Sequence, residues 1–192
     1  MPLNVPNLLT WLRILLIPAF LVVYYVPDTW LTGAQKDLVA TALFAIAAVT
    51  DWLDGYLARV LDQASAFGEF LDPVADKLMV AAALILLVGL GRVNAIIAVI
   101  IIGRELAITA LREWMAKLGK SKSVAVNFLG KVKTFCQMAA ILLLLYNGVL
   151  LDVVDTGRLG TVLIYIAAGL TLWSMIYYLK MALPFMWGRH EG

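Results

Sequence analysis

Cysteine and histidine are almost absent from this sequence, which contains one of each, Cys136 and His190. A single cysteine excludes a disulfide framework, and its apolar surroundings predict a small buried hydrophobic side chain. His190 lies in the C-terminal tail, where we expect a solvated side chain rather than a metal ligand. Linkers rich in Ser, Gly or Pro are also lacking, as are repeats and low-complexity tracts. These absences predict a single domain that covers residues 1–192.

A cleavable signal pattern is missing as well, because the apolar run Leu8–Val26 is too long and no small-residue cleavage site follows it. Apolar residues are abundant instead. They make up 63% of the chain, against about 45–50% in soluble domains, and the mean hydropathy is +0.92. A soluble domain of this size could not hide so much apolar surface from water. The composition therefore predicts an integral membrane protein.

Six apolar runs have the length of about 20 residues that a membrane-spanning helix requires. Lipid offers no hydrogen bonds to the backbone, so each span is expected to be helical. The predicted fold is all-α, a polytopic membrane bundle of six transmembrane helices. The predicted spans are Leu8–Val26, Leu38–Leu57, Pro73–Leu90, Val93–Leu111, Val132–Leu151 and Leu159–Leu179.

Lysine and arginine are distributed unevenly between the two sides of this predicted bundle. One side has only Lys36, Arg92 and Arg158 in its short connections. The positive-inside rule places the richer side in the cytoplasm, together with both termini. The basic residues of that side are Arg13, Arg59, Lys77, Arg112, Lys117, Lys120, Lys122, Lys131, Lys133, Lys180 and Arg189.

Four aspartates lie at the predicted cytoplasmic ends of the second and third spans. Asp51 and Asp54 share one helix face at a spacing of three residues, and Asp72 and Asp76 share another at a spacing of four. The connection between the spans lets the two pairs converge. Clustered carboxylates repel one another unless a counter-charge is present, and Mg²⁺ and Mn²⁺ prefer such oxygen ligands. A pair of divalent ions is the common arrangement for displacement at phosphorus.

Each aspartate also has a simpler explanation. Asp72 precedes Pro73, as an N-cap residue precedes a proline in the first turn of a helix. Asp51 and Asp54 could merely end a helix in the membrane interface. Capping needs only one of the four, however, and ionisable residues at membrane depth are functional by default. The four together therefore favour a metal site.

The residues Asp51, Asp54, Gly55, Ala58, Arg59, Gly68, Asp72 and Asp76 fit the pattern D-x2-D-G-x2-A-R-x8-G-x3-D-x3-D. This pattern resembles the CDP-alcohol phosphotransferases, integral membrane enzymes of phospholipid synthesis with six helices. The resemblance implies two divalent ions, Mg²⁺ or Mn²⁺, held by the four aspartates, with Asp76 also the general base. It further implies that Gly55, Ala58 and Gly68 let the CDP moiety of the donor approach, and that Arg59 binds its pyrophosphate.

Asn7, Thr10 and Arg13 are weaker candidates for contact with the donor headgroup, since Asn7 could equally be a helix N-cap. The family also implies a homodimer in the bacterial inner membrane, with its active site on the cytoplasmic side. We expect no nucleic-acid partner.

The alcohol acceptor is not specified by the aspartate motif. Arg104 falls inside an apolar run, and Arg112, Lys131 and Lys133 could join it in a pocket that binds an anion. Such a pocket suits a phosphorylated acceptor. The chain is also similar to the branch of the family that joins CDP-diacylglycerol to glycerol 3-phosphate. That similarity lies in the segments Asn4–Arg13, Ala48–Trp52, Gly103–Leu106, Ala110–Ala116 and Gly130–Thr134.

Other readings of the sequence stay open at this point. The acceptor could be inositol phosphate, serine or phosphatidylglycerol instead. The aspartates could also form the ion site of a divalent-cation transporter, although transporter sites lie near the membrane midplane and often accompany inverted repeats. The sequence shows no repeat, and its carboxylates gather at one membrane face.

Overall fold

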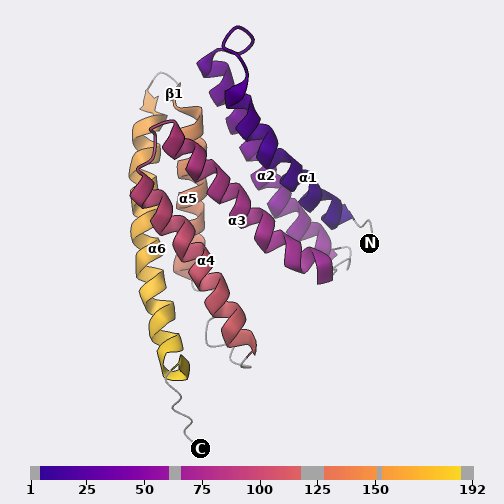
Figure 1. Cartoon of the computed structure of the whole chain (residues 1–192), viewed down its shortest axis with the longest axis vertical. Coiled ribbons are helices and arrows are strands. Elements are labelled where there is room, and N and C mark those ends of the chain that lie inside the picture. The colour runs from indigo at the N-terminus through magenta and orange to yellow at the C-terminus, as the bar shows by residue number, and fades with distance from the viewer. Residues whose placement is uncertain (1–4, 61–65, 118–127, 151–152, 187–192) are drawn as a thin grey trace, which may run out of the picture.

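The structure, a computed structural model, describes residues 5–60, 66–117, 128–150 and 153–186. Within these ranges six α-helices are joined by short connections and one small β-hairpin (Figure 1). The all-α prediction is confirmed. The elements are α1 (Val5–Val22), the 3-10 turn η1 (Val23–Tyr25), α2 (Gly33–Val60), α3 (Ala66–Gly89), α4 (Ala95–Lys117), α5 (Phe128–Tyr146), β1 (Val149–Leu150), β2 (Val154–Asp155) and α6 (Thr156–Met186).

Three of the helices begin at polar caps. Thr32 and Gln35 form a reciprocal capping box at the start of α2, in which the Gln35 side chain accepts from the Thr32 N–H at 2.9 Å. The Asn94 side chain accepts from the Ile96 N–H at 2.8 Å, and the Asp155 side chain accepts from the Arg158 N–H at 3.0 Å. These bonds satisfy backbone donors that the first turn of a helix leaves without partners.

The ends of α3 and α5 follow from residues in the left-handed backbone region. Gly91 has φ +70° and Asn147 has φ +43°, values that glycine and asparagine adopt most easily. At Gly91 two bonds, Gly91 N–H to Val88 O and Arg92 N–H to Leu87 O, form a Schellman motif. The third span is predicted to end at Leu90, and α3 ends one residue earlier, at Gly89.

Two predicted boundaries are wrong. The third helix begins at Ala66 rather than Pro73, so the proline lies inside α3 and Asp72 is not an N-cap. Proline lacks an N–H, but one missing hydrogen bond does not prevent residues 66–72 from being helical. The fifth helix ends at Tyr146 rather than Leu151, because Asn147 terminates it. The chain then forms the hairpin that pairs Val149 with Asp155 and Leu150 with Val154.

The helices pack around one main apolar core. α1 packs against α2 and α3, α5 packs against α6 and α2, and α4 packs against α6 and α3. Phe20 of α1 meets Phe44 of α2 edge to face at a centroid distance of 6.2 Å. Met79, Ile101 and Ile141 bring α3, α4 and α5 into the same core. Each helix is thus held by partners that are distant in the sequence.

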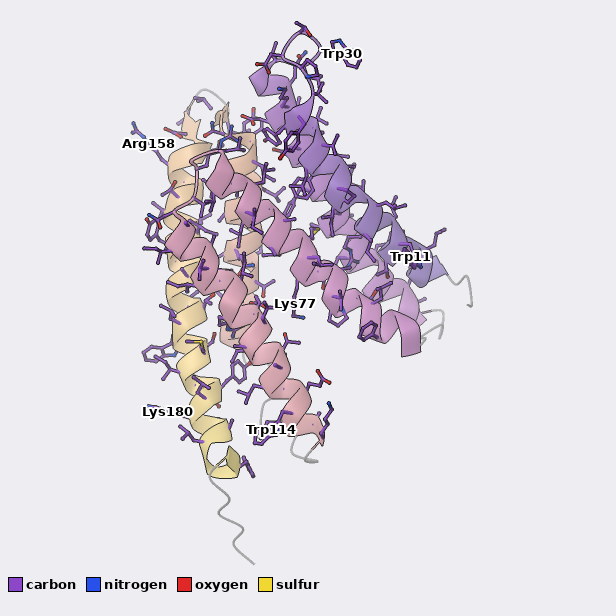
Figure 2. The ribbon with its side chains drawn as sticks, in the orientation of Figure 1. Trp11, Trp30, Lys77, Trp114, Arg158 and Lys180 are labelled. Carbon is purple, nitrogen blue, oxygen red and sulfur yellow. The ribbon has the colours of Figure 1, made fainter. Side chains whose placement is uncertain are left out.

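Two described helices are long and apolar enough to cross a membrane, over Leu8–Tyr25 and Thr156–Leu183. The apolar part of α5, Val132–Tyr146, is shorter. The first residues of α1 and the last residues of α6 both lie away from the β-hairpin (Figure 1). Figure 2 shows Arg158 near the hairpin and Trp30 at the same end of the molecule, with Trp114 and Lys180 toward the other end.

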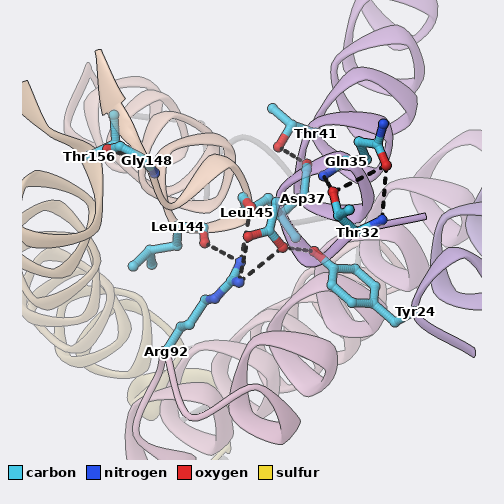
Figure 3. Close-up of polar contacts among 10 residues, drawn as sticks. All are labelled: Tyr24, Thr32, Gln35, Asp37, Thr41, Arg92, Leu144, Leu145, Gly148 and Thr156. Carbon is cyan, nitrogen blue, oxygen red and sulfur yellow. Dashed lines mark hydrogen bonds and ion pairs between the residues drawn. The ribbon is translucent and has the colours of Figure 1, made fainter. Parts of the chain in front are cut away.

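Near the hairpin, Arg92 ties three helices together (Figure 3). Its guanidinium donates to both oxygens of Asp37 at 2.9 and 2.7 Å and to the carbonyls of Leu144 and Leu145 at 3.1 and 3.0 Å. The Tyr24 hydroxyl donates to the same Asp37 carboxylate at 2.8 Å. The α3–α4 turn is thereby fixed to α2 and to the end of α5.

Candidate active site

Arg13 of α1 brings together carboxylates from two other helices. Its side chain is 0% exposed, and its Nη1 lies 2.8 Å from Asp51 Oδ1 on α2. The same nitrogen donates to Asp76 Oδ1 on α3. The Asp51 and Asp76 side chains are themselves 40% and 42% exposed. Arg13 therefore holds two aspartates side by side, with part of each carboxylate still accessible.

Asp72 is oriented by a second residue of α1. The buried Thr10 hydroxyl donates to Asp72 Oδ1 at 2.5 Å. Thr10 and Arg13 share a face of α1, one turn apart, and Asp72 and Asp76 share a face of α3 in the same way. Two polar contacts at matching spacing fix the register between these helices at the site.

A cavity of about 190 Å³ opens beside the Asp51 and Asp76 carboxylates, and we call it the acidic cavity. Helices α2, α3, α4 and α5 contribute to its wall. Lys77, whose ammonium donates to the Pro73 carbonyl at 3.1 Å, also lines it. Figure 2 shows Lys77 on the side of α3 that faces α4. The remaining lining residues are Met79, Val80, Glu105, Lys133, Thr134, Gln137 and Met138.

Glu105 lies at the centre of a charged group formed by α4, α5 and α6. Its Oε1 accepts a hydrogen bond from the buried Lys133 ammonium and another from Arg104 Nη1 at 3.1 Å. Arg104 Nη2 donates to the Ser174 hydroxyl at 2.6 Å. The buried cations Arg104 and Lys133 thus share one carboxylate, which balances only one of their two positive charges.

A second cavity, of about 220 Å³, lies on the other side of this group, and we call it the basic cavity. The guanidinium groups of Arg104 and Arg112 both lie over the Tyr178 ring, at 5.7 and 5.6 Å from its centroid. Both arginines line the cavity together with Lys133. Three of the four basic residues singled out in the sequence therefore surround one space. Arginine side chains suit the bidentate binding of phosphate.

The two cavities share a wall that consists of Glu105, Lys133 and Thr134. Of these two cavities, only the acidic one is lined by Asp51 and Asp76, and only the basic one is lined by Arg104 and Arg112. A small molecule with an anionic end and a hydroxyl end could therefore place its anion among the arginines and its hydroxyl near the aspartates.

Several predicted residues lie outside the part of the chain whose side chains the structure describes. They are Asn7, Asp54, Gly55, Ala58, Arg59 and Lys131. Gly68 is described and is buried in α3. Neither Glu105 nor Tyr178 was predicted as a site residue from the sequence, and Arg13 was predicted only to approach the donor headgroup. For Glu105 the missed signal was a charged residue inside an apolar run, the criterion that selected Arg104.

The described carboxylates suit a hard divalent cation. Asp51 and Asp76 have accessible oxygens at one cavity, and the single positive charge of Arg13 balances only one of these two carboxylates. Carboxylate oxygen is the donor that Mg²⁺ and Mn²⁺ prefer. Among the described residues no group of three or more acidic, cysteine or histidine side chains is clustered closely enough to hold an ion. Asp54, the fourth candidate, lies outside the described side chains.

Comparison with known proteins gives one consistent result. Residues 3–185 match the model of the CDP-alcohol phosphatidyltransferase family. The chain is 47% identical over 184 residues to a protein of Escherichia coli (strain K12) and to one of Shigella flexneri serotype 5b. Each alignment covers 95% of this chain and 96% of the relative. Both relatives are named CDP-diacylglycerol–glycerol-3-phosphate 3-phosphatidyltransferase.

Proposed function

The chain belongs to the CDP-alcohol phosphatidyltransferase family, and from this premise we propose that it transfers a phosphatidyl group from CDP-diacylglycerol to glycerol 3-phosphate. The products are phosphatidylglycerol phosphate and CMP. The names of the relatives support both the reaction and the acceptor. The structural observation that carries the proposal is the shared wall between a cavity with two aspartates and a cavity with two arginines.

The acceptor is proposed to lie across this wall. Arg104, Arg112 and Lys133 offer donors for its phosphate in the basic cavity. Lys131 would join them from the start of α5. The free hydroxyl at the other end of glycerol 3-phosphate then reaches the acidic cavity. Holding both ends of the acceptor supplies the proximity on which such a transfer depends.

The chemistry is a displacement at the phosphorus that carries diacylglycerol. The acceptor oxygen forms a bond to this phosphorus as the bond to the CMP oxygen breaks, and Asp76 takes the hydroxyl proton. Arg13 orients Asp76, since its guanidinium bonds the Asp76 carboxylate. Arg59, Gly55, Ala58 and Gly68 are proposed to receive the CDP moiety.

Enzymes of this family use divalent metal ions. We propose Mg²⁺ or Mn²⁺ here, with Asp51, Asp54, Asp72 and Asp76 as the ligands. When bound, the ions would neutralise the diphosphate of the donor and the charge on departing CMP. Thr10 would then act through Asp72 as a positioning residue, because its hydroxyl bonds that carboxylate.

The membrane is the natural location of this reaction, because the donor is a lipid. Two apolar helices and the family indicate a membrane protein. We further propose that all six helices cross the bacterial inner membrane, that both termini and the site face the cytoplasm, and that the protein is a homodimer. Several charged residues inside these helices line the cavities, as expected for spanning helices; they are Asp51, Asp76, Lys77, Arg104, Glu105, Arg112 and Lys133.

The proposal is tested by CMP release from the purified protein in detergent with CDP-diacylglycerol and Mg²⁺. Glycerol 3-phosphate, inositol phosphate, serine and phosphatidylglycerol are compared as acceptors at equal concentration. We expect release with glycerol 3-phosphate alone. Release with serine or inositol phosphate would reassign the acceptor. No release with any of them, from folded protein that CDP protects against thermal unfolding, would contradict a transferase function.

A further inference from the structure

Glu105 has a position that neither its salt bridges nor the proposed phosphate site explains. Pairing with Arg104 and Lys133 does not require the carboxylate to be exposed to the cavities, and an exposed carboxylate repels a bound phosphate. Glu105 nevertheless lines both the acidic and the basic cavity. Its side chain is 25% exposed, although its partners Lys133 and Arg104 are only 4% and 8% exposed. The carboxylate is therefore accessible from the space that the acceptor is proposed to occupy.

The two oxygens of Glu105 differ in their contacts. Both hydrogen bonds, from Lys133 and from Arg104, end on Oε1. Within the described part of the chain Oε2 receives no hydrogen bond. An ionised carboxylate accepts about four hydrogen bonds, so Glu105 keeps acceptor capacity on a side chain whose orientation is already fixed through Oε1. Fixed orientation is what recognition of a small polar group requires.

We propose that Glu105 is a specificity-determining residue that accepts a hydrogen bond from the middle hydroxyl of the acceptor. This inference rests on the proposed function, and it adds the contact that recognises the middle hydroxyl of glycerol 3-phosphate. Glycerol 3-phosphate has its phosphate at one end, its reacting hydroxyl at the other, and one further hydroxyl between them. With the phosphate among the arginines and the reacting hydroxyl near Asp76, the middle of the molecule meets the shared wall, which contains Glu105.

The test compares glycerol 3-phosphate with 3-hydroxypropyl phosphate, which keeps the phosphate and the terminal hydroxyl and lacks only the middle hydroxyl. The quantity measured is the ratio of the two kcat/KM values, from CMP release. A hydrogen bond to a charged group contributes about 1.5–3 kcal/mol, which corresponds to a ratio of about 10–150 in the unsubstituted protein. A ratio near one in that protein would overturn the proposal without any variant.

The variants Glu105→Ala and Glu105→Gln then assign the discrimination to this side chain. We expect Glu105→Ala to lose most of the ratio, mainly through a lower kcat/KM for glycerol 3-phosphate. Glu105→Gln, which keeps an acceptor oxygen without the charge, should give an intermediate ratio and carries the test if the alanine variant fails to fold. The matched control is Glu113→Gln on the same helix, where the carboxylate is 67% exposed and pairs with Lys117. Its ratio should equal that of the unsubstituted protein.

A merely structural role predicts a different result. If Glu105 only held Lys133 and Arg104 in place, its variants would lower kcat/KM for both acceptors by the same factor and leave the ratio unchanged. That outcome would overturn the inference while the transferase function stands. Failure of the unsubstituted protein to release CMP with glycerol 3-phosphate would instead reject the proposed function itself, so the two failures are distinguishable.

Discussion

Arg13 is fully buried in α1, yet its guanidinium is bonded by carboxylates from α2 and α3. A charge in this position is stabilised only by partners of opposite sign. The same carboxylates open onto the acidic cavity. At the scale of single residues, therefore, one buried cation positions the two acids proposed to hold metal and to accept the proton.

The role of Asp76 as the base gives the first prediction. Asp76→Asn should reduce kcat by about 10²–10⁴-fold, because the amide cannot accept the proton from the acceptor hydroxyl. Donor binding should be largely retained, and protection from thermal unfolding by CDP measures it. Loss of that protection together with kcat would show that Asp76 holds the donor rather than acting as the base.

Arg112 gives the second prediction. Arg112→Ala should raise the KM for glycerol 3-phosphate by about 10–150-fold, the equivalent of one charge-assisted hydrogen bond, and leave the KM for CDP-diacylglycerol nearly unchanged. Lys117→Ala is the control, because Lys117 is 73% exposed and pairs only with Glu113 among the described residues. Equal increases in both KM values for Arg112→Ala would assign Arg112 to the structure, through its contact with Tyr178.

At this scale the sequence predicts which residue types carry the chemistry but not which atoms meet. The aspartate motif and the basic residues near α4 and α5 are visible as charges inside or beside apolar runs. The pairing of Arg13 with Asp51 and Asp76, and of Glu105 with Lys133, depends on how separate helices pack. Spacing along one helix holds no information about that packing.

Among the elements, α5 and α6 pack closely against each other at Gly160. A Cβ atom at this position would lie 2.7 Å from Leu144 Cγ and 3.1 Å from the Leu144 backbone nitrogen. Glycine allows the two helices to pack this closely, as small residues do in membrane bundles. Farther along the same pair of helices, Lys133 of α5 and Tyr178 of α6 line the basic cavity.

The third prediction follows from this contact. Gly160→Ala should destabilise the protein by about 1–3 kcal/mol, because the added methyl group overpacks the interface. A lower midpoint of thermal unfolding in detergent would report it. Gly169→Ala on the same helix is the matched control, since nothing lies within 4 Å of a Cβ there. Equal midpoints for the two variants would contradict the close packing of α5 on α6.

Element boundaries were predictable where a local signal exists. Gly91 ends α3 because its positive φ forms the Schellman motif. The start of α3 was misplaced, because Pro73 suggested a first turn and residues 66–72 lie before the apolar run. The hairpin after α5 was missed because its four strand residues, Val149, Leu150, Val154 and Asp155, are too few to give a pattern.

At the scale of the whole molecule, the proposed site is separate from the Arg92–Asp37 pair, which lies near the hairpin (Figure 3). Asp37→Asn should lower stability by about 3 kcal/mol, because it leaves the mostly buried Arg92 uncompensated. Both KM values should stay unchanged below the unfolding temperature. A changed KM would show that the Arg92–Asp37 pair is coupled to the proposed site. Arg158→Gln, at an exposed pair, should change neither quantity.

At this scale the sequence predicted an all-α chain with six helices, and the structure has them. Hydropathy could show this, because each span is a local property of its own residues. The arrangement of α1 against α3, and of α4 against α6, was not predictable, because no lipid-facing or core-facing pattern in one span identifies its neighbour. The two cavities and their shared wall are products of that arrangement.

The most direct test of the central claim is the identity of the lipid product. CDP-diacylglycerol is incubated with the purified protein, Mg²⁺ and ¹³C-labelled glycerol 3-phosphate, and lipid and CMP are quantified by mass spectrometry. Phosphatidyl transfer predicts one labelled phosphatidylglycerol phosphate for each CMP released. Unlabelled phosphatidic acid in equal amount to CMP, with the label left in the aqueous phase, would show hydrolysis of the donor and would contradict the account.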